Sequence, residues 1–155
     1  MKKKPIRRKK GKAHIAAKKK TVDGHDFKSG LEVYCYTKLK ENKLFEHYED
    51  ETFTLVESFT PGNRCCERQT NGKGSFTVRD GKVRGIQYTP DFTADDYIIE
   101  TKGFANATFP LRWKLFKHYL KQWGDTRDIY KPQSREDVDI MVELIKLRRN
   151  TNNKN

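Results

Sequence analysis

The most constraining feature of this sequence is residues 88–103, where two strand-like runs stand on either side of the polar pair Asp95-Asp96. If this pair is the loop of a two-residue hairpin, Asp91 in the first strand lies directly opposite Glu100 in the second. Because side chains two residues apart share one face of a strand, Lys102 points to the same side as Glu100. Carboxylates directly opposite one another, with Cβ atoms roughly 4.5–5.5 Å apart, destabilise a sheet. A divalent cation between them would remove that penalty, so the pattern predicts a metal site with an ammonium group beside it.

Two features leave the register of this hairpin open. Asp-Asp is a weaker hairpin signal than Asn-Gly, and a slip of one residue would send Asp91 to the other face. Pro90 cannot donate to a ladder, so it indicates a strand start, an edge or a bulge, and a bulge would re-aim Asp91. The alternative for Glu100 and Lys102 is an exposed ion pair on a solvated strand. Against it, Ile98 precedes them on the same face, which is how a core strand ends in a site.

The positive charge of the chain is concentrated at its N-terminus. The 155 residues carry a formal net charge of +12, and residues 1–20 contain eleven lysines and arginines, Arg7 and Arg8 among them, with no acidic residue. Such a block is typical of a disordered segment that binds polyanions, so we expect DNA contacts from it. A solubilising or targeting tail is the alternative. The chain is therefore divided into a disordered basic N-terminal arm (1–27), one domain (28–150) and a frayed tail (151–155).

Composition excludes several classes of protein. No stretch approaches 18 apolar residues, so the sequence predicts no membrane span. The basic N-terminus lacks the apolar segment of a secretory signal. The three cysteines (Cys35, Cys65 and Cys66) are too few for a disulfide framework, and the four histidines fall at no zinc spacing. We expect a cytoplasmic protein with reduced thiols.

Capping signals and periodicity predict an α/β fold. Ser29 with Glu32 three residues later resembles a capping box, and Pro110 suits the first turn of a second helix. A strand on either side of that second helix implies a right-handed parallel crossover, and hence a mixed central sheet flanked by helices. The predicted elements are helices over 30–42, 110–123 and 134–149, strands over 53–59, 76–78, 83–88, 91–94, 97–102 and 129–130, and a loop over 61–74. Asp80-Gly81 is predicted as the turn of a hairpin between 76–78 and 83–88. The predicted inward faces of the last two helices are Leu111, Leu115, Phe116, Tyr119, Leu120 and Trp123, and Val138, Met141, Val142, Leu144 and Ile145.

The residues around the motif are those that metal-assisted hydrolysis requires. Magnesium prefers hard oxygen ligands, which Asp91, Glu100 and the carbonyl of Thr101 supply, and manganese accepts the same ligands. Glu32, on the first helix, is placed to reach this metal or a second one. Bound metal lowers the pKa of a coordinated water and neutralises charge on a phosphate. Lys102 would orient the nucleophile and stabilise the developing charge. Phosphodiester hydrolysis needs these parts and no organic cofactor.

At Pro90-Asp91 and at Glu100-Thr101-Lys102, the chain resembles the PD-(D/E)xK nuclease superfamily. The resemblance implies a restriction-endonuclease-like αβββαβ core, here followed by a C-terminal helix. It also implies a DNA endonuclease that depends on Mg²⁺, for which Mn²⁺ can substitute. In such a site Asp91 and Glu100 bind metal, Lys102 assists the water, and Glu32 on the first core helix completes the set.

Small size and a basic arm make the chain most similar to phage and prophage endonucleases, including the phage endonuclease I junction resolvases. This implies cleavage of branched or junction DNA in phage DNA processing or recombination, in the cytoplasm of the host cell. Members of the superfamily often hold the scissile phosphate with basic residues on the helix after the motif. Arg112 lies nearest the start of that helix, where phosphate binding is favoured, and its guanidinium binds bidentately. Lys114 and Lys117 share one polar face, for which a solvated surface is the alternative.

Two other functions remain as alternatives. A basic nucleic-acid-binding protein without catalysis needs only the N-terminal arm and the helix bases, and would bind with steep salt dependence and no metal. A sequence-specific restriction-type nuclease would need a readout element, for which residues 60–75 are the only candidate in the sequence. A homodimer would suit paired cuts, although no heptad pattern indicates one.

Overall fold

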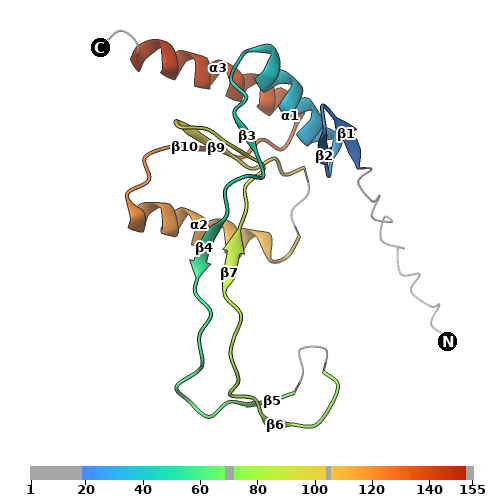
Figure 1. The fold of residues 1–155 in the computed structure, drawn as a ribbon, viewed down its shortest axis with the longest axis vertical. Helices are drawn as coiled ribbons and strands as arrows, with labels where there is room; N and C mark the ends of the chain where they lie inside the picture. The colour runs from blue at the N-terminus through green and yellow to red at the C-terminus, as the bar shows by residue number, and fades with distance from the viewer. Residues whose placement is uncertain (1–18, 69–71, 104–105, 153–155) are drawn as a thin grey trace, which may run out of the picture.

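The computed structural model describes residues 19–68, 72–103 and 106–152, and its fold is mixed α/β. Helices and a four-stranded mixed sheet form a body, from which a long two-stranded ribbon extends (Figure 1). In chain order the elements are β1 (Lys20–Val22), β2 (His25–Phe27), α1 (Gly30–Glu41), β3 (His47–Tyr48), β4 (Phe53–Val56), β5 (Cys66–Glu67), β6 (Thr77–Val78), β7 (Ile86–Tyr88), β8 (Phe92–Thr93), β9 (Tyr97–Ile99), α2 (Phe109–Trp123), β10 (Asp128–Tyr130) and α3 (Arg135–Asn152).

The central sheet has the strand order β10-β9-β8-β3, in which β9 and β10 are parallel and the other pairs are antiparallel. In the β8–β9 hairpin, Phe92 lies opposite Ile99. The N–H of Ala94 donates to the carbonyl of Tyr97 across 3.0 Å, so residues 95–96 form a two-residue loop. The predicted register of this hairpin is therefore confirmed, and its next pair sets residue 91 opposite residue 100.

Backbone hydrogen bonds carry the sheet past the end of β9 into the motif. The N–H groups of Glu100 and Lys102 donate to the carbonyls of Tyr130 and Pro132, at 3.0 and 2.9 Å. Because α2 lies between β9 and the parallel β10, the predicted parallel crossover is confirmed. The motif backbone is thus fixed on one side by the hairpin and on the other by the segment after β10.

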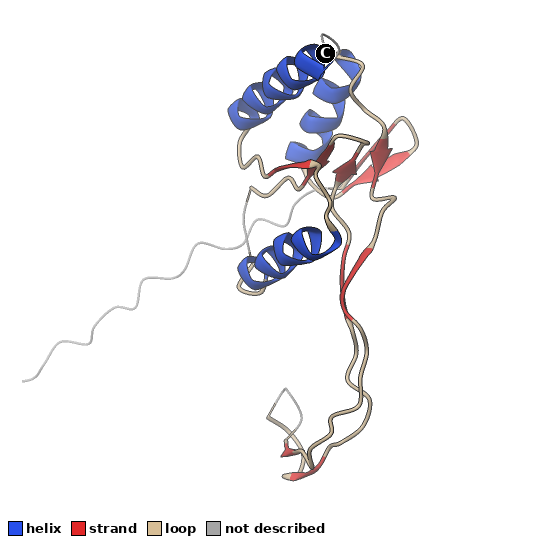
Figure 2. Ribbon diagram, turned by 90° about the vertical axis from the view of Figure 1, so that its left-hand side faces the viewer, coloured by secondary structure: helices blue, strands red, loops and turns tan. Residues whose placement is uncertain are grey.

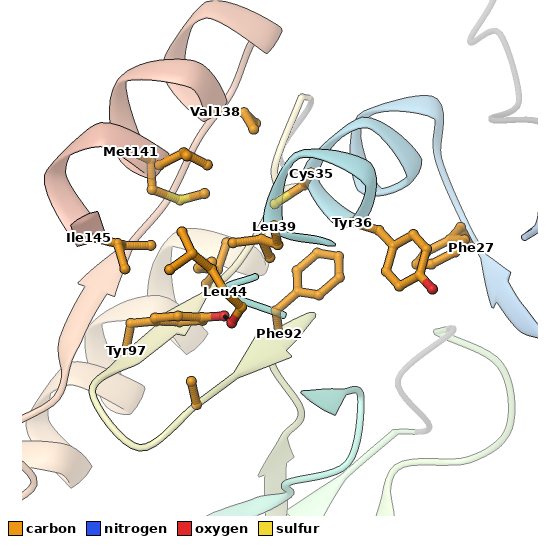
Figure 3. Close-up of a cluster of buried hydrophobic side chains, with 13 residues drawn as sticks. Phe27, Cys35, Tyr36, Leu39, Leu44, Phe92, Tyr97, Val138, Met141 and Ile145 are labelled. Carbon is orange, nitrogen blue, oxygen red and sulfur yellow. Dashed lines mark hydrogen bonds between the residues drawn. The ribbon is translucent and has the colours of Figure 1, made fainter. Parts of the chain in front are cut away.

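The two faces of β9 are buried in different layers, which explains why its three residues are all apolar. Tyr97 and Ile99 join the core that α1 and α3 form on one face (Figure 3). Ile98 joins the core of the other face, where α2 contributes Phe116 and Leu120. A strand buried on both sides reads as a continuous apolar run. Glu100 and Lys102 follow Ile98 by the two-residue period, so their side chains lie on the α2 side of the sheet.

The predicted helix ends are largely confirmed. The hydroxyl of Ser29 accepts from the N–H of Glu32 at 3.1 Å, and Ser134 and Asp137 cap α3 reciprocally. Gly124 ends α2 with a φ of 67°, a left-handed conformation that glycine adopts without strain. α3 continues to Asn152, past its predicted end, so residues 151 and 152 of the predicted frayed tail are helical, and residues 153–155 lie outside the described residues. None of the described helices is long and apolar enough to cross a membrane.

Three side chains predicted to face inward are exposed. Leu111 is 63% exposed, Trp123 74% and Leu144 49%. On α2 the core contains Phe109, Phe116 and Leu120, whereas Leu111 and Trp123 lie outside it. The prediction was wrong here because helical periodicity gives the direction of an apolar stripe but not how much of it another element covers.

The predicted boundary of the N-terminal arm was also wrong. β1 and β2 form an antiparallel hairpin whose last residue, Phe27, is fully buried against α1. Its turn is Asp23-Gly24, with φ angles of 51° and 83°, and Asp-Gly is a strong signal for this kind of turn. The ordered domain therefore begins at least eight residues earlier than predicted, since β1 starts at Lys20. Residues 1–18, with Arg7 and Arg8, lie outside the described residues.

The hairpin predicted around residues 80–81 does not form. β7 pairs with β4, with Tyr88 opposite Phe53, while β6 pairs with β5. Phe53 and Tyr88 both pack on α2, so burial of these two aromatic rings favours the long-range pairing over the local turn. The strand predicted over 53–59 ends at Val56. The described residues 57–68 and 72–84, here called the ribbon, run out from the body and back (Figures 1 and 2).

Gly85 lets the two strands approach closely at the base of the ribbon. A Cβ added there would lie 2.6 Å from the carbonyl oxygen of Val56 and 3.1 Å from the nitrogen of Ser58, both backbone atoms. We expect Gly85→Ala to lower the free energy of unfolding by about 1–3 kcal/mol, as overpacking does. Urea unfolding measures the loss. Gly62→Ala is the control, because a Cβ at Gly62 meets no atom within 4 Å; equal stability of the two variants would contradict the expectation.

Candidate active site

A pocket of about 600 Å³ opens where the motif strands end, between the start of α1 and the start of α2. All four residues predicted to be catalytic, Glu32, Asp91, Glu100 and Lys102, line it together with Thr101. The structure therefore brings the predicted set into one place from three separate segments. Its other lining residues are Lys28, Ser29, Leu31, Glu49, Tyr88, Thr89, Gly103, Asn106, Phe109 and Arg112.

Asp91 is held from across the hairpin by Thr101. Its Oδ2 atom accepts from the N–H of Thr101 at 2.7 Å and from the Thr101 hydroxyl at 2.6 Å. Both residues are buried, with 8% and 6% of their surface exposed. Since both hydrogen bonds go to one carboxylate oxygen, Asp91 is fixed in orientation while Oδ1 stays available to a ligand.

Glu100 and Lys102 lie side by side at the end of the strand, as the two-residue period predicts. The Lys102 ammonium lies 3.1 Å from Oε1 of Glu100. It also sits over the ring of Phe109, 4.7 Å from the centroid. Glu100 is 5% exposed, whereas the Lys102 side chain is 28% exposed. The pair therefore places a partly solvent-exposed ammonium beside a buried carboxylate.

The surroundings of the two motif carboxyls disfavour their ionised forms, so the pKa values of both are raised. Burial and the nearby Glu100 charge, acting against the Thr101 hydrogen bonds, together raise the pKa of Asp91 to about 7. Burial also raises the pKa of Glu100, although the Lys102 ammonium works in the opposite direction. Two carboxyls in one site behave in this way because ionising one disfavours ionising the other.

Glu32 is anchored on the opposite wall of the pocket. Its Oε2 atom accepts from the N–H of Lys28 at 2.7 Å and from the Tyr48 hydroxyl at 3.1 Å. The Ser29 cap of the predicted capping box is confirmed, but the Glu32 carboxylate accepts from the N–H of Lys28, one residue before the cap residue, and not from that of Ser29. Burial, and then the Glu32 charge, raise the pKa of Tyr48, which keeps its hydroxyl protonated as a donor.

The carboxylates fit a divalent cation in chemistry, but they do not form a complete set of ligands. Among the described residues, no three Asp, Glu, His or Cys side chains lie close enough together to hold a metal ion. Glu32 therefore does not form one set of metal ligands with Asp91 and Glu100. Its carboxylate instead accepts hydrogen bonds from Lys28 and Tyr48. Asp91 and Glu100 do offer hard oxygen donors, and among the described residues the Lys102 ammonium is the one cation bonded to either of them, which leaves negative charge that a divalent cation would offset.

The residues predicted to bind DNA are not equivalent in the structure. Arg112 lines the pocket, donates to the carbonyl of Gln87 and lies over the Tyr88 ring. Lys114 and Lys117 are exposed on α2 and do not line it. Arg112 is thus the helix base nearest the predicted chemistry.

Sequence reasoning missed Tyr88 and Lys28. The Tyr88 hydroxyl is buried close to the Glu100 carboxyl. Burial, and then the charge of Glu100, raise the Tyr88 pKa. The Lys28 ammonium donates to Glu49. This hydrogen bond, together with the charges of Asp91 and Glu32, raises the Lys28 pKa. For Tyr88 the sequence signal is its position three residues before Asp91. No sequence signal separates Lys28 from the other basic residues.

Comparison with known proteins gives one match. A family model described as "Protein of unknown function (DUF1064)" matches residues 12–131, which include every motif residue of the pocket. No curated protein and no solved structure matches the chain.

Proposed function

The chain belongs to the DUF1064 family, and we propose that it is a metal-dependent DNA endonuclease that hydrolyses phosphodiester bonds. The observation that carries the proposal is the buried pair Asp91 and Glu100 in a pocket, with Lys102 beside Glu100. An exposed ion pair on a solvated strand would leave Glu100 in water, yet only 5% of it is exposed. Burying two like charges costs stability, and groups with perturbed pKa values in a pocket are candidates for function.

The arrangement of strands supports membership of the PD-(D/E)xK superfamily. The β3–β8 and β4–β7 ladders are consecutive parts of two long strands, since the N–H of Glu49 donates to the Asp91 carbonyl between them (2.9 Å). With these joined, and with the short β5–β6 pair of the ribbon left aside, the elements from α1 to β10 run helix, strand, strand, strand, helix, strand. The strands lie in the sheet in the same order as in the chain. This is the αβββαβ order expected of that superfamily, with α3 added.

Each pocket residue has a distinct role in this proposal. Asp91, Glu100 and the Thr101 carbonyl would hold Mg²⁺ or Mn²⁺, with Glu32 on the opposite wall. When bound, the cation lowers the pKa of a coordinated water and offsets phosphate charge. Lys102, anchored by Glu100, orients the attacking water and stabilises the charge that develops on the phosphate. Arg112 holds a phosphate oxygen at the pocket.

The substrate class follows from the resemblance and the charge. We propose that the enzyme acts in the cytoplasm on branched or junction DNA, as in phage DNA processing or recombination. Lys114, Lys117 and the N-terminal Arg7 and Arg8 would add contacts to the DNA backbone. A homodimer would suit paired cuts.

The test is cleavage of a labelled four-way junction, with linear duplex and single strand beside it. Each DNA is incubated with Mg²⁺, with Mn²⁺ and with EDTA. We expect cleavage in either metal and none in EDTA, with the junction cut fastest. Binding without cutting in every condition would favour a non-catalytic nucleic-acid-binding protein. Cutting of linear duplex at one sequence would favour a restriction-type nuclease.

A further inference from the structure

The ribbon has no core of its own. None of its described residues, 57–68 and 72–84, is buried. It is held together by the β5–β6 pair and by backbone contacts such as the bridge between Phe59 and Val83. Both views show it standing clear of the helices (Figures 1 and 2). An isolated two-stranded hairpin is at best marginally stable in water, so the ribbon is suited to pack against a partner.

The charge of the ribbon indicates what that partner is. Arg64, Lys82 and Arg84 are exposed and form no ion pair or hydrogen bond with any part of the chain that the structure describes. A surface with unneutralised bases on both strands is complementary to a polyanion. A second copy of the same ribbon would bring like charges together, which disfavours a dimer through this surface. The ribbon holds six basic residues against three acidic ones: Arg64, Arg68, Lys73, Arg79, Lys82 and Arg84 against Glu57, Glu67 and Asp80.

The strand that follows the ribbon leads into the candidate active site. β7 runs directly into the pocket, where Tyr88 and Thr89 line the wall and the Gln87 carbonyl is bound by Arg112. In Figure 1 the tip of the ribbon turns to the side on which α2 begins. Ten residues of extended strand rise about 33 Å, so each strand reaches roughly one turn of duplex away from the pocket.

From this geometry we propose that the ribbon lies along duplex DNA and seats in its major groove, about one helical turn from the bond held in the pocket. The major groove of B-form DNA admits a two-stranded β-ribbon. The inference rests on the proposed function and narrows it. The substrate must carry intact duplex on the ribbon side of the cleaved bond, and single-stranded DNA lacks that contact.

The test removes three ribbon charges and reads binding in EDTA, where no cleavage occurs. The variant is Arg64→Gln, Lys82→Gln and Arg84→Gln. The matched control, Lys38→Gln, Lys43→Gln and Lys146→Gln, removes three charges from the α1 and α3 region at the other end of the molecule. Fluorescence anisotropy with a 30-base-pair duplex and with one of its strands is measured at several salt concentrations.

We expect the ribbon variant to bind duplex at least tenfold more weakly near 0.1 M salt, and its salt slope to fall by about two to three, because each lost phosphate contact removes about 0.9. Binding of the single strand should weaken less than binding of the duplex. The control should stay within about twofold of the unmodified protein. An unchanged duplex slope in the ribbon variant would overturn the proposal. The proposal would also be overturned if sedimentation showed that the unmodified protein is a dimer and the ribbon variant is not. That result would mean that the ribbon binds a second copy of the chain. Since binding is read without metal, failure here is distinct from failure of the nuclease assay.

Discussion

Lys102→Ala should reduce the rate of DNA cleavage by about 10²–10³-fold or more, which is what loss of one preorganised stabilising group costs a hydrolytic site. In the described part of the chain, the Lys102 ammonium is the only lysine ammonium of the pocket that bonds to Asp91 or Glu100. Its loss leaves the attacking water unoriented and the phosphate charge unbalanced. Duplex binding should remain within a few-fold, because most affinity for DNA comes from backbone contacts elsewhere.

Lys131→Ala is the matched control for this prediction. The Lys131 ammonium lies over the same Phe109 ring as that of Lys102, at 5.9 Å against 4.7 Å, but Lys131 does not line the pocket. Any effect of losing a cation from that ring is therefore shared by both variants. Single-turnover cleavage rates and anisotropy binding curves separate chemistry from affinity. Full cleavage by the Lys102 variant, or an equal loss in both variants, would remove Lys102 from the proposed mechanism.

The parts of the fold that follow local rules were predictable from the sequence. The register of the β8–β9 hairpin follows from a two-residue loop and period-two alternation, and this placed Asp91 and Glu100 together. The Ser29 cap follows from one hydroxyl three residues before a glutamate. Such features depend on residues within nine positions of one another, so local sequence patterns predict them.

The parts that failed depend on contacts distant in sequence. The pairing of β4 with β7 joins Phe53 to Tyr88, and the local turn at residues 80–81 gives no hint of it. The cost of closing such a long loop is offset by burying both rings on α2. The same limit applies to the pocket. Glu32 was predicted from its position on the helix, but its hydrogen bond from Tyr48 depends on the folded sheet and could not be predicted from local sequence.

The second large effect concerns stability in the absence of metal. The Asp91 carboxyl has a folded-state pKa of about 7 against an ordinary value of 3.8. A raised pKa means that the folded protein prefers the protonated form. The stabilisation that comes from this preference for the protonated carboxyl is complete below about pH 4 and is lost as the pH rises through 7. At pH 8 the ionised Asp91 therefore destabilises the metal-free fold.

We expect Asp91→Asn to raise the free energy of unfolding at pH 8 in EDTA by an amount of the order of 2–4 kcal/mol, since one pKa unit corresponds to about 1.4 kcal/mol. The asparagine keeps an oxygen that accepts from Thr101, as Asp91 does. The gain should shrink as the pH falls toward 4. Urea unfolding at pH 5 and pH 8 measures it, and Asp95→Asn in the exposed hairpin loop should change stability by less than about 0.5 kcal/mol.

Added Mg²⁺ should reverse the order of the two proteins at pH 8. A cation that binds the folded state stabilises it by mass action, and the unmodified protein keeps the carboxylate that the variant lacks. If Asp91→Asn is instead less stable than the unmodified protein in EDTA at pH 8, the Asp91 anion is stabilised by the fold alone. The carboxylate would then have no need of a cation, and the case for a metal between Asp91 and Glu100 would be lost.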